Sequence, residues 1–484
     1  MRRPAASKGW HRLVLLGMAG LLTSMTSCTR APAPDEMLAY GATWTSVRPS
    51  VVWCGDRLST VTIETHVQSP SRVISARIVG PNETISLHDD GSHGDRVAGD
   101  GVFTASEVRP YCHSRFTLRF ERSLAVWSGR LLLTTADGKV WEDPVPLRIG
   151  LVNPKYRLKS DVATWGDGVS TTANAIFIQD VDHRVFDRYP VSATPIDEAL
   201  RVAARMVYRT APDVFDFLVL MPAMPMFAAD GGTEVAAASV RVSNDVLHIG
   251  IPIFNDAGDF SSSGRLQSAI FHSFGSLDLV DREIVRRWAP DAGVPLGLAH
   301  SDAEGCGCWV ETSDIGGHLA AAAQVDGRLG RLVSSGEGTW SLTPVPQTEP
   351  YAPLEMYLMG LLPSSLVPPV HILLDPKAAD SSRVTGQQTR TVTAEEIVAA
   401  LGGEREPASA SGEPILFTVA FVIVGEDPFG DAEYAFYTLL SYMLASSGPP
   451  LEGDLFSPFS WATGGKAALD TDLPFAAPPS STER

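Results

Sequence analysis

The chain has 484 residues, of which 44% are hydrophobic and 19% are charged. These proportions are typical of a globular protein, and the length suffices for two or three domains. Acidic residues outnumber basic ones by 56 to 38, which argues against nucleic acid or anionic lipid as the main partner.

Residues 1–27 have the pattern of an export signal peptide. An apolar stretch from Leu13 to Leu22 is too short to cross a bilayer as a stable helix, but it fits the apolar part of such a signal. Four basic side chains and no acidic ones precede it: Arg2, Arg3, Lys8 and Arg12. Without residues 1–27, 34 basic and 56 acidic residues remain, a net charge of −22. No later segment has about twenty uninterrupted apolar residues, so we expect no other membrane span.

The signal ends on Met25-Thr26-Ser27-Cys28. These residues resemble the lipobox of bacterial lipoproteins, although Met25 stands where that family usually has Leu. The resemblance implies that Cys28 is lipidated, becomes the new N-terminus and anchors the protein to the bacterial cell envelope, at the outer membrane or the cell surface. An ordinary cleaved signal peptide and an uncleaved anchor are the alternatives. Residues 28–45 contain Ala-Pro-Ala-Pro and are expected to form a flexible tether.

Residues 46–152 alternate short β-rich runs with turns, which predicts an all-β sandwich of immunoglobulin-like size. The expected strands are Ser59–Val67, Arg72–Val79, Phe116–Phe120, Gly129–Thr135 and Val145–Leu151. Cys54 and Cys112 lie near the two ends of this region. Their positions are those expected of a disulfide in an oxidising compartment.

An acidic, glycine-rich stretch at 87–104 carries Asp89, Asp90, Asp95 and Asp100. Carboxylates on such a loop are suitable ligands for Ca²⁺, although their spacing is not that of an EF-hand. The alternative is turn chemistry, in which the carboxylates accept hydrogen bonds from nearby backbone amides and no ion binds. The stretch also resembles the Asp-Gly-rich signature of exported bacterial β-sandwich modules, which implies an accessory or spacer domain.

Residues 155–472 alternate strands and helices, which predicts a larger α+β domain after a Gly/Ser/Thr-rich link near 164–172. The expected strands are Ala175–Gln179, Phe215–Met221, Val246–Ile253 and Ile415–Val424. The expected helices begin at Thr194-Pro195, at the capping box Thr393-x-x-Glu396 and at Ala432, and another carries Leu266, Ile270, Phe274 and Leu277 at helical spacing. Residues 473–484 are expected to be a disordered tail.

Several stretches of this domain resemble secreted bacterial proteins with a zincin-type metallopeptidase domain. They are 242–250, 264–272, 353–361 and 462–466, and Leu354-Glu355-Met356-Tyr357-Leu358-Met359-Gly360-Leu361 is the most distinctive. Zincins require His-Glu-x-x-His on one helix, where the histidines bind zinc and Glu activates water. This chain has His272-Ser273-Phe274-Gly275-Ser276, so Ser273 and Ser276 replace the base and the second ligand. We therefore expect a degenerate domain without peptidase activity.

A different zinc site would combine His272 with His300, Cys306 and Cys308. Four such ligands suit a closed structural zinc, which has no open position for catalysis. Oxidised cysteines or simple loop thiols are the favoured interpretation of Cys306-Gly-Cys308, so zinc is not expected. Asp180, Asp182 and His183 follow a predicted strand, and a polar turn is favoured there over a site.

Three functional hypotheses follow. In the first, the protein is a membrane-anchored lipoprotein whose peptidase-like domain is inactive and binds an unidentified protein or glycan, or acts as a scaffold. In the second, it is an active metal-dependent hydrolase with a non-standard site. In the third, it is a purely structural protein of the envelope.

Overall fold

The computed structural model describes residues 42–67, 73–112, 124–143, 146–157, 162–228, 237–274, 280–288, 350–374, 388–409, 413–449 and 458–474, with shorter strands at 300–344 and 377–385. The predicted signal peptide and Cys28 lie outside the described residues, as do Phe116–Phe120 and residues 475–484. Among the residues described, no helix is both long enough and apolar enough to cross a membrane.

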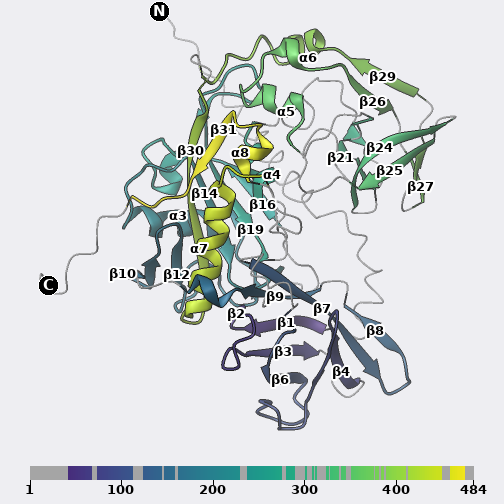
Figure 1. Ribbon diagram of the computed structural model, residues 1–484, viewed down its shortest axis with the longest axis vertical. Coiled ribbons are helices and arrows are strands. Elements are labelled where there is room, and N and C mark those ends of the chain that lie inside the picture. The colour runs from purple at the N-terminus through teal and green to yellow at the C-terminus, as the bar shows by residue number, and fades with distance from the viewer. Residues whose placement is uncertain are drawn as a thin grey trace, which may run out of the picture.

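The N-terminal region is rich in β-strands. Its strands are β1 (Ala42–Arg48), β2 (Val51–Trp53), β3 (Val61–Val67), β4 (Val73–Val79), β5 (Thr84–Leu87), β6 (Val102–Val108), β7 (Leu124–Thr135), β8 (Val140–Glu142) and β9 (Leu147–Val152). One sheet has the order β1-β3-β6, and the other has the order β2-β9-β7-β4-β5 with β8 beside β7. Both sheets contribute side chains to one apolar core, and every second residue of β3 is buried. The two sheets therefore form a β-sandwich, seen at the bottom of Figure 1.

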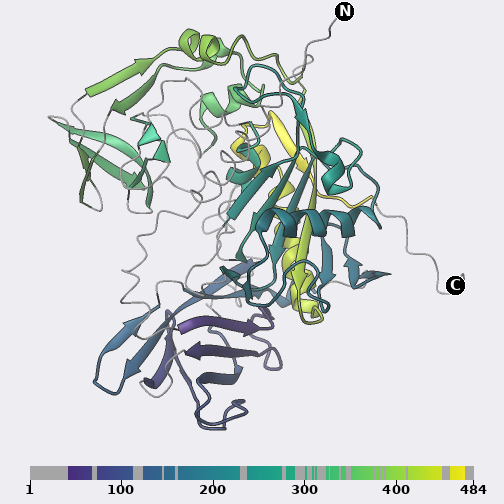
Figure 2. The same cartoon turned by 180° about the vertical axis from the view of Figure 1, so that it is seen from behind.

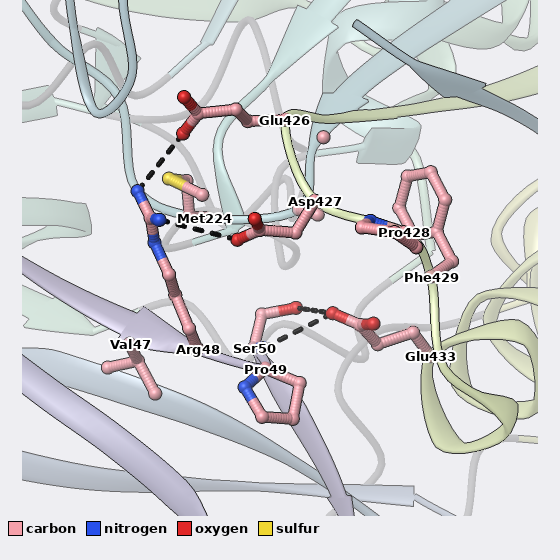
Figure 3. A pocket seen from close by; sticks show the side chains of 12 residues that line it. Val47, Arg48, Pro49, Ser50, Met224, Glu426, Asp427, Pro428, Phe429 and Glu433 are labelled. Atoms are coloured by element: carbon pink, nitrogen blue, oxygen red, sulfur yellow. Dashed lines mark hydrogen bonds and ion pairs between the residues drawn. The ribbon is translucent and has the colours of Figure 1, made fainter. Parts of the chain in front are cut away.

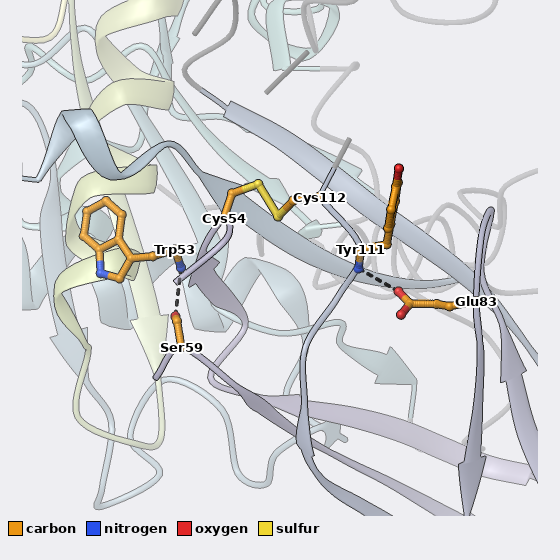
Figure 4. Close-up of a disulfide and its surroundings, with 6 residues drawn as sticks. All are labelled: Trp53, Cys54, Ser59, Glu83, Tyr111 and Cys112. Carbon is orange, nitrogen blue, oxygen red and sulfur yellow. Dashed lines mark hydrogen bonds between the residues drawn. A yellow bond between two sulfur atoms is a disulfide. The ribbon is translucent and has the colours of Figure 1, made fainter. Parts of the chain in front are cut away.

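Two details of this region bear on the sequence predictions. Strand β1 begins at Ala42, so the predicted tether 28–45 is wrong over its last residues; the ring of Trp44 stacks on His66 at 3.7 Å between centroids. The predicted disulfide between Cys54 and Cys112 is confirmed, with 5.7 Å between the Cα atoms. Because Cys54 follows β2 and Cys112 follows β6, the bond joins the two sheets (Figure 4).

The second region is built on an eight-stranded sheet with the order β10-β11-β12-β30-β14-β19-β16, and β31 pairs with β30. These strands are β10 (Ala163–Gly166), β11 (Val169–Thr171), β12 (Ile176–Gln179), β14 (Phe217–Pro222), β16 (Ala237–Arg241), β19 (Ser268–His272), β30 (Ile415–Gly425) and β31 (Ala467–Asp470). Strands β12, β30, β14 and β19 are parallel to one another, whereas β16 at the edge is antiparallel. The central strands β14 and β30 are mostly apolar and buried, as expected of strands covered on both faces.

Helices cover both faces of this sheet. Alternate residues of β30 point to opposite sides: Val419, Phe421 and Ile423 join one core, and Ala420, Val422 and Val424 join the other. Helix α3 (Ile196–Tyr208) packs on the second side. Helices α4 (Val280–Val285), α5 (Pro353–Leu358), α7 (Asp431–Ala445) and α8 (Phe459–Ala462) pack on the first. Helix α7 crosses this face in Figure 1, and Figure 2 shows the molecule from behind.

The sandwich and the sheet region share one apolar core. Val51, Trp53, Leu124 and Val152 of the sandwich belong to the same cluster as the residues that α7 buries on the sheet. Gly150 of β9 lies at this junction. An added Cβ would lie 2.8 Å from the side chain of Val51 and 3.2 Å from the rings of Phe274, which follows β19, and Phe436 of α7. The two regions are therefore joined by core packing.

The remaining elements are short or lie between β19 and β30. The short pairs are β13 (Val191–Ser192) with β15 (Phe227–Ala228), and β17 (Ser243–Asn244) with β18 (Phe254–Asn255). Short 3-10 helices occur at η2 (Pro154–Tyr156), η3 (Ala257–Phe260) and η6 (Ser364–Leu366), and α6 spans Ala394–Ala400. Three small sheets contain β20 (His300–Ser301), β21 (Cys308–Trp309), β22 (Glu311–Thr312), β23 (Ala323–Val325), β24 (Arg328–Gly336), β25 (Thr339–Pro344), β26 (Val370–Leu374), β27 (Lys377–Asp380), β28 (Arg383–Thr385) and β29 (Gln388–Val392).

Three predicted elements of the second region are wrong. The helix expected around Leu266, Ile270 and Phe274 is strand β19, whose five residues are all buried, so its apolar positions have no two-residue alternation. The strand expected at Val246–Ile253 is a loop, held by the Asn244 amide, which donates to the carbonyls of Val246, Ile251 and Pro252. The Gly/Ser/Thr-rich link is the β10–β11 hairpin, which turns at glycines 166 and 168, both with positive φ.

Candidate functional site

The acidic loop of the sandwich brings together Asp89, Asp95 and Asp100, with one carboxylate oxygen of each within 4.8 Å of the others. Asp89 accepts hydrogen bonds from the backbone N–H groups of residues 99, 100 and 101, and Asp95 accepts them from Gly91 and Val97. These contacts are the predicted turn chemistry. They leave carboxylate lone pairs for a cation, so both the calcium and the turn interpretation are compatible with this geometry.

Asp90 takes part in a different group of the same loop. It lies with His88 and His93, whose rings stack at 4.0 Å between centroids. The hydroxyl and the backbone N–H of Ser92 donate to Asp90, and these bonds lower the pKa of this carboxyl. The four predicted calcium ligands are thus divided between two neighbouring clusters.

His272 lies at the end of β19 and is fully buried. Strand alternation points its side chain to the same face as Ile270, toward the core that contains α7. The first residue of the segment 272–276 therefore closes a buried strand, and Gly275 and Ser276 lie outside the described residues. Among the residues whose side chains are described, no three metal-ligating groups gather around His272.

The other predicted zinc ligands are only partly described. His300 and Cys308 lie on the paired strands β20 and β21, where His300 is opposite Trp309 and Ser301 is opposite Cys308. Cys306 and Ser276 lie outside the described residues. The structure therefore brings strands 300–301 and 308–309 together, and the four-ligand zinc site stays the less favoured alternative.

Asp180, which follows β12, organises a turn. Its buried carboxylate accepts hydrogen bonds from the backbone N–H groups of residues 184, 185 and 186 and from the hydroxyl of Tyr189. All of these donors belong to residues 184–189, in the loop between β12 and α3, so the hydrogen bonds fix the conformation of this loop. This geometry favours the polar-turn interpretation of Asp180.

A pocket of about 300 Å³ lies at the junction of the two regions (Figure 3). Residues 47–50 of the sandwich form one wall, and residues 223–224 and 425–429, which follow β14 and β30, form the other with Glu433 of α7. Strands β14 and β30 are parallel neighbours, so both of their carboxyl ends open on this pocket. In open α/β sheets, ligands bind in the crevice outside the carboxyl ends of the strands.

Charged side chains meet across this pocket. Arg48 of the sandwich donates to Glu426 at 3.0 Å, and its guanidinium is 3.5 Å from Asp427. His183 reaches the other oxygen of Glu426 at 3.8 Å between Nε2 and Oε1. All four side chains are partly exposed. These ion pairs therefore contribute little stability individually, and their groups can exchange partners with a ligand.

Glu433 lies deeper in the same pocket. Ser50 donates to it from its hydroxyl at 2.9 Å and from its backbone N–H at 3.2 Å, and the Gly430 N–H donates at 2.9 Å. Burial raises the pKa of Glu433. The three hydrogen bonds oppose that shift because they stabilise the carboxylate. Glu433 thus connects the first turn of α7 to the sandwich.

No family model, no curated protein and no solved structure matches this chain. The site residues therefore rest on the sequence and the geometry alone. The sequence does not predict the junction pocket, because Arg48 and Ser50 lie 378 and 383 residues from their partners Glu426 and Glu433. The only local signal was the acidic turn Glu426-Asp427-Pro428 after an apolar strand.

Proposed function

We propose that this protein is a lipid-anchored extracytoplasmic binding protein whose ligand occupies the junction pocket. An immunoglobulin-like sandwich and a peptidase-like α+β domain without hydrolytic activity form one body behind the lipidated Cys28. The observation that carries the proposal is the pocket itself: it lies at the carboxyl ends of two parallel strands and is lined by converging polar groups.

The charges of the pocket indicate the class of ligand. Three carboxyl groups line the pocket, those of Glu426, Asp427 and Glu433, and Arg48 is the only Lys or Arg among the lining residues that the structure describes. Met224 and Phe429 supply apolar surface. A ligand with an ammonium or guanidinium group on a short apolar body would match this lining. A basic side chain or the free amino terminus of a partner protein has this chemistry.

Loss of hydrolysis is supported by two features of the His272 segment. Ser273 replaces the general base, and His272, the position of the first ligand, is the last residue of a fully buried strand. A general base alone contributes on the order of 10²–10⁴-fold to a rate. An active hydrolase would have to use other groups.

Ligand binding is tested by thermal unfolding of the purified protein in the presence of lysine- and arginine-containing peptides. A saturable rise in Tm that is lost in Glu426→Gln/Asp427→Asn supports the proposal. A matched exposed pair, Glu198→Gln/Asp197→Asn on α3, should leave the rise unchanged. Equal responses of all three proteins would contradict binding in the junction pocket.

Catalysis and anchoring need separate measurements. Stoichiometric zinc that His272→Ala abolishes, together with cleavage of casein or a peptide library, would show an active peptidase instead. Lipidation predicts that the protein partitions into the detergent phase of Triton X-114 and that Cys28→Ala moves it to the aqueous phase. An unchanged partition would refute the lipid anchor without bearing on the pocket.

A further inference from the structure

Among the residues that the structure describes, Arg287 is a buried cation without a hydrogen-bonding partner. It follows α4, its side chain is 1% exposed, and none of its three guanidinium nitrogens makes a hydrogen bond to a described residue. Its backbone N–H bonds to the Ile284 carbonyl, which continues the turn of α4. Buried charges in proteins are normally paired, because an unpaired one costs several kcal/mol.

Apolar side chains of the sheet core lie beside Arg287. Ile284, Val285 and Trp288 belong to the core of the sheet, and the Trp288 ring packs against Phe217 and Phe417 at 5.8 and 5.4 Å between centroids. The Arg287 guanidinium carbon is 6.0 Å from the centre of the Trp288 ring. Burial lowers the pKa of Arg287 to about 10, so the side chain still carries its positive charge at neutral pH.

Two further arginines, Arg241 and Arg405, interact electrostatically with Arg287. Arg241, the last residue of β16, donates to the carbonyl of Arg286 at 3.3 Å, which holds it against the turn that carries Arg287. Arg405 binds the carbonyl of Leu358 through Nε. Both arginines repel the charge of Arg287, and Asp245 is the carboxylate that attracts it. Asp245 is exposed. The negative charges of Asp245 and Glu406 also attract the charge of Arg405.

We propose that Arg287, with Arg241 and Arg405 at its rim, binds a doubly charged oxyanion of the phosphate type. The guanidinium fork offers two parallel N–H donors to such an oxyanion. A dianion suits the position because a second and a third cation are near enough to interact with it. This site would be exceptional in a chain whose net charge is −18, and it is independent of the junction pocket.

The enclosure of Arg287 has a consequence for binding. Arg241 and Arg405 are half-buried, so the oxyanion approaches along them and displaces side chains that cover Arg287. Trp288 therefore changes its environment on binding. Inorganic phosphate should alter the tryptophan fluorescence saturably at constant ionic strength. Trp288→Phe should lose most of this change while still binding phosphate in a calorimeter.

The decisive variant is Arg287→Met, which keeps the volume and removes the charge. If no group of the chain pairs with Arg287, the variant melts at a higher temperature than the unmodified protein in phosphate-free buffer. It also loses the rise in Tm that saturating phosphate gives the unmodified protein. Arg205→Met, on the exposed side of α3, is the matched control and should retain the full phosphate response.

Two results would overturn the proposal. The first is a lower Tm of Arg287→Met without phosphate, because it would show that a carboxylate of the chain neutralises Arg287. The second is a phosphate response that is absent from the unmodified protein or equal in both proteins. Arg241→Gln is the milder variant, expected to weaken phosphate binding by about tenfold or less. Acetate in place of phosphate should bind more weakly, since it carries one charge; equal binding of both would contradict the dianion.

Discussion

Gly150→Ala tests whether the two regions form one body. Gly150 lies on β9, where an added methyl group would be 2.8 Å from Val51 and 3.2 Å from the rings of Phe274 and Phe436. Val51 belongs to the sandwich, whereas the two rings belong to the sheet region. The methyl group therefore pushes the two regions apart, and the side chains it meets are themselves fixed in the core.

The expected cost follows from two opposing effects. Overpacking of a well-filled core costs about 1–3 kcal/mol. Replacing glycine in a strand recovers roughly 0.5–1 kcal/mol because the unfolded chain loses conformational freedom. The central values of the two ranges, about 2 and about 0.75 kcal/mol, give a net loss in the free energy of unfolding of about 1 kcal/mol.

Urea denaturation followed by tryptophan fluorescence and circular dichroism measures this loss. We expect one cooperative transition whose midpoint falls in Gly150→Ala, with coincident curves for the two signals. Gly258→Ala is the matched control, because Gly258 has open space around its Cβ position and no positive φ. An unchanged midpoint, or two separate transitions of which only one shifts, would refute the shared core.

Three further predictions concern single features. Removing the disulfide by Cys54→Ser/Cys112→Ser should lower stability by about 4 kcal/mol, the chain-entropy value for its separation of 58 residues; an unchanged urea midpoint would contradict this. Burial raises the pKa of Glu433, so the folded state binds its proton more tightly than the unfolded state. The stability of the protein relative to Glu433→Gln should therefore fall as pH rises from the ordinary glutamate pKa through the raised one. A Tm difference between the two proteins that stays constant from pH 4 to 8 would show that the shift is absent. If Ca²⁺ binds the sandwich loop, the Tm in calcium buffer should be higher than the Tm in EDTA buffer, and Asp95→Asn should abolish this difference. Equal Tm values in the two buffers would mean that the carboxylates of the loop accept backbone hydrogen bonds without binding an ion.

Local sequence signals predicted the elements that local interactions determine. The capping box at Thr393 forms both of its hydrogen bonds and begins α6. Helix α7 starts one residue before the predicted position, and β30 extends the predicted strand by one residue. In each case the residues that carry the signal lie within the element itself, so packing against distant parts of the chain does not change its conformation.

The errors come from elements whose conformation depends on distant packing. Strand β19 is covered on both faces, so its sequence lacks the alternation that distinguishes a strand from a helix. The polar hairpin β10–β11 has the composition of a link, but it joins a sheet edge by pairing with β12, a contact that its composition does not reveal. The same limit applies to the sites. Arg48 and Glu426 meet only after the fold has formed, and the burial of Arg287 depends on packing around α4.

The two proposed sites lie at opposite ends of the central sheet. Trp288, beside Arg287, packs on Phe417 near the start of β30, whereas the junction pocket begins at Gly425. Eight residues of extended strand separate them by roughly 26 Å. Sites more than about 10 Å apart that share no partners usually act independently, so we expect the anion at one end to have little effect on the cation at the other. Free-energy changes from Arg287→Met and Glu426→Gln should therefore add within about 0.5 kcal/mol. A larger deviation in the double variant would mean that strand β30 itself transmits a change between them, and the protein would then couple the binding of an anion to that of a cationic ligand.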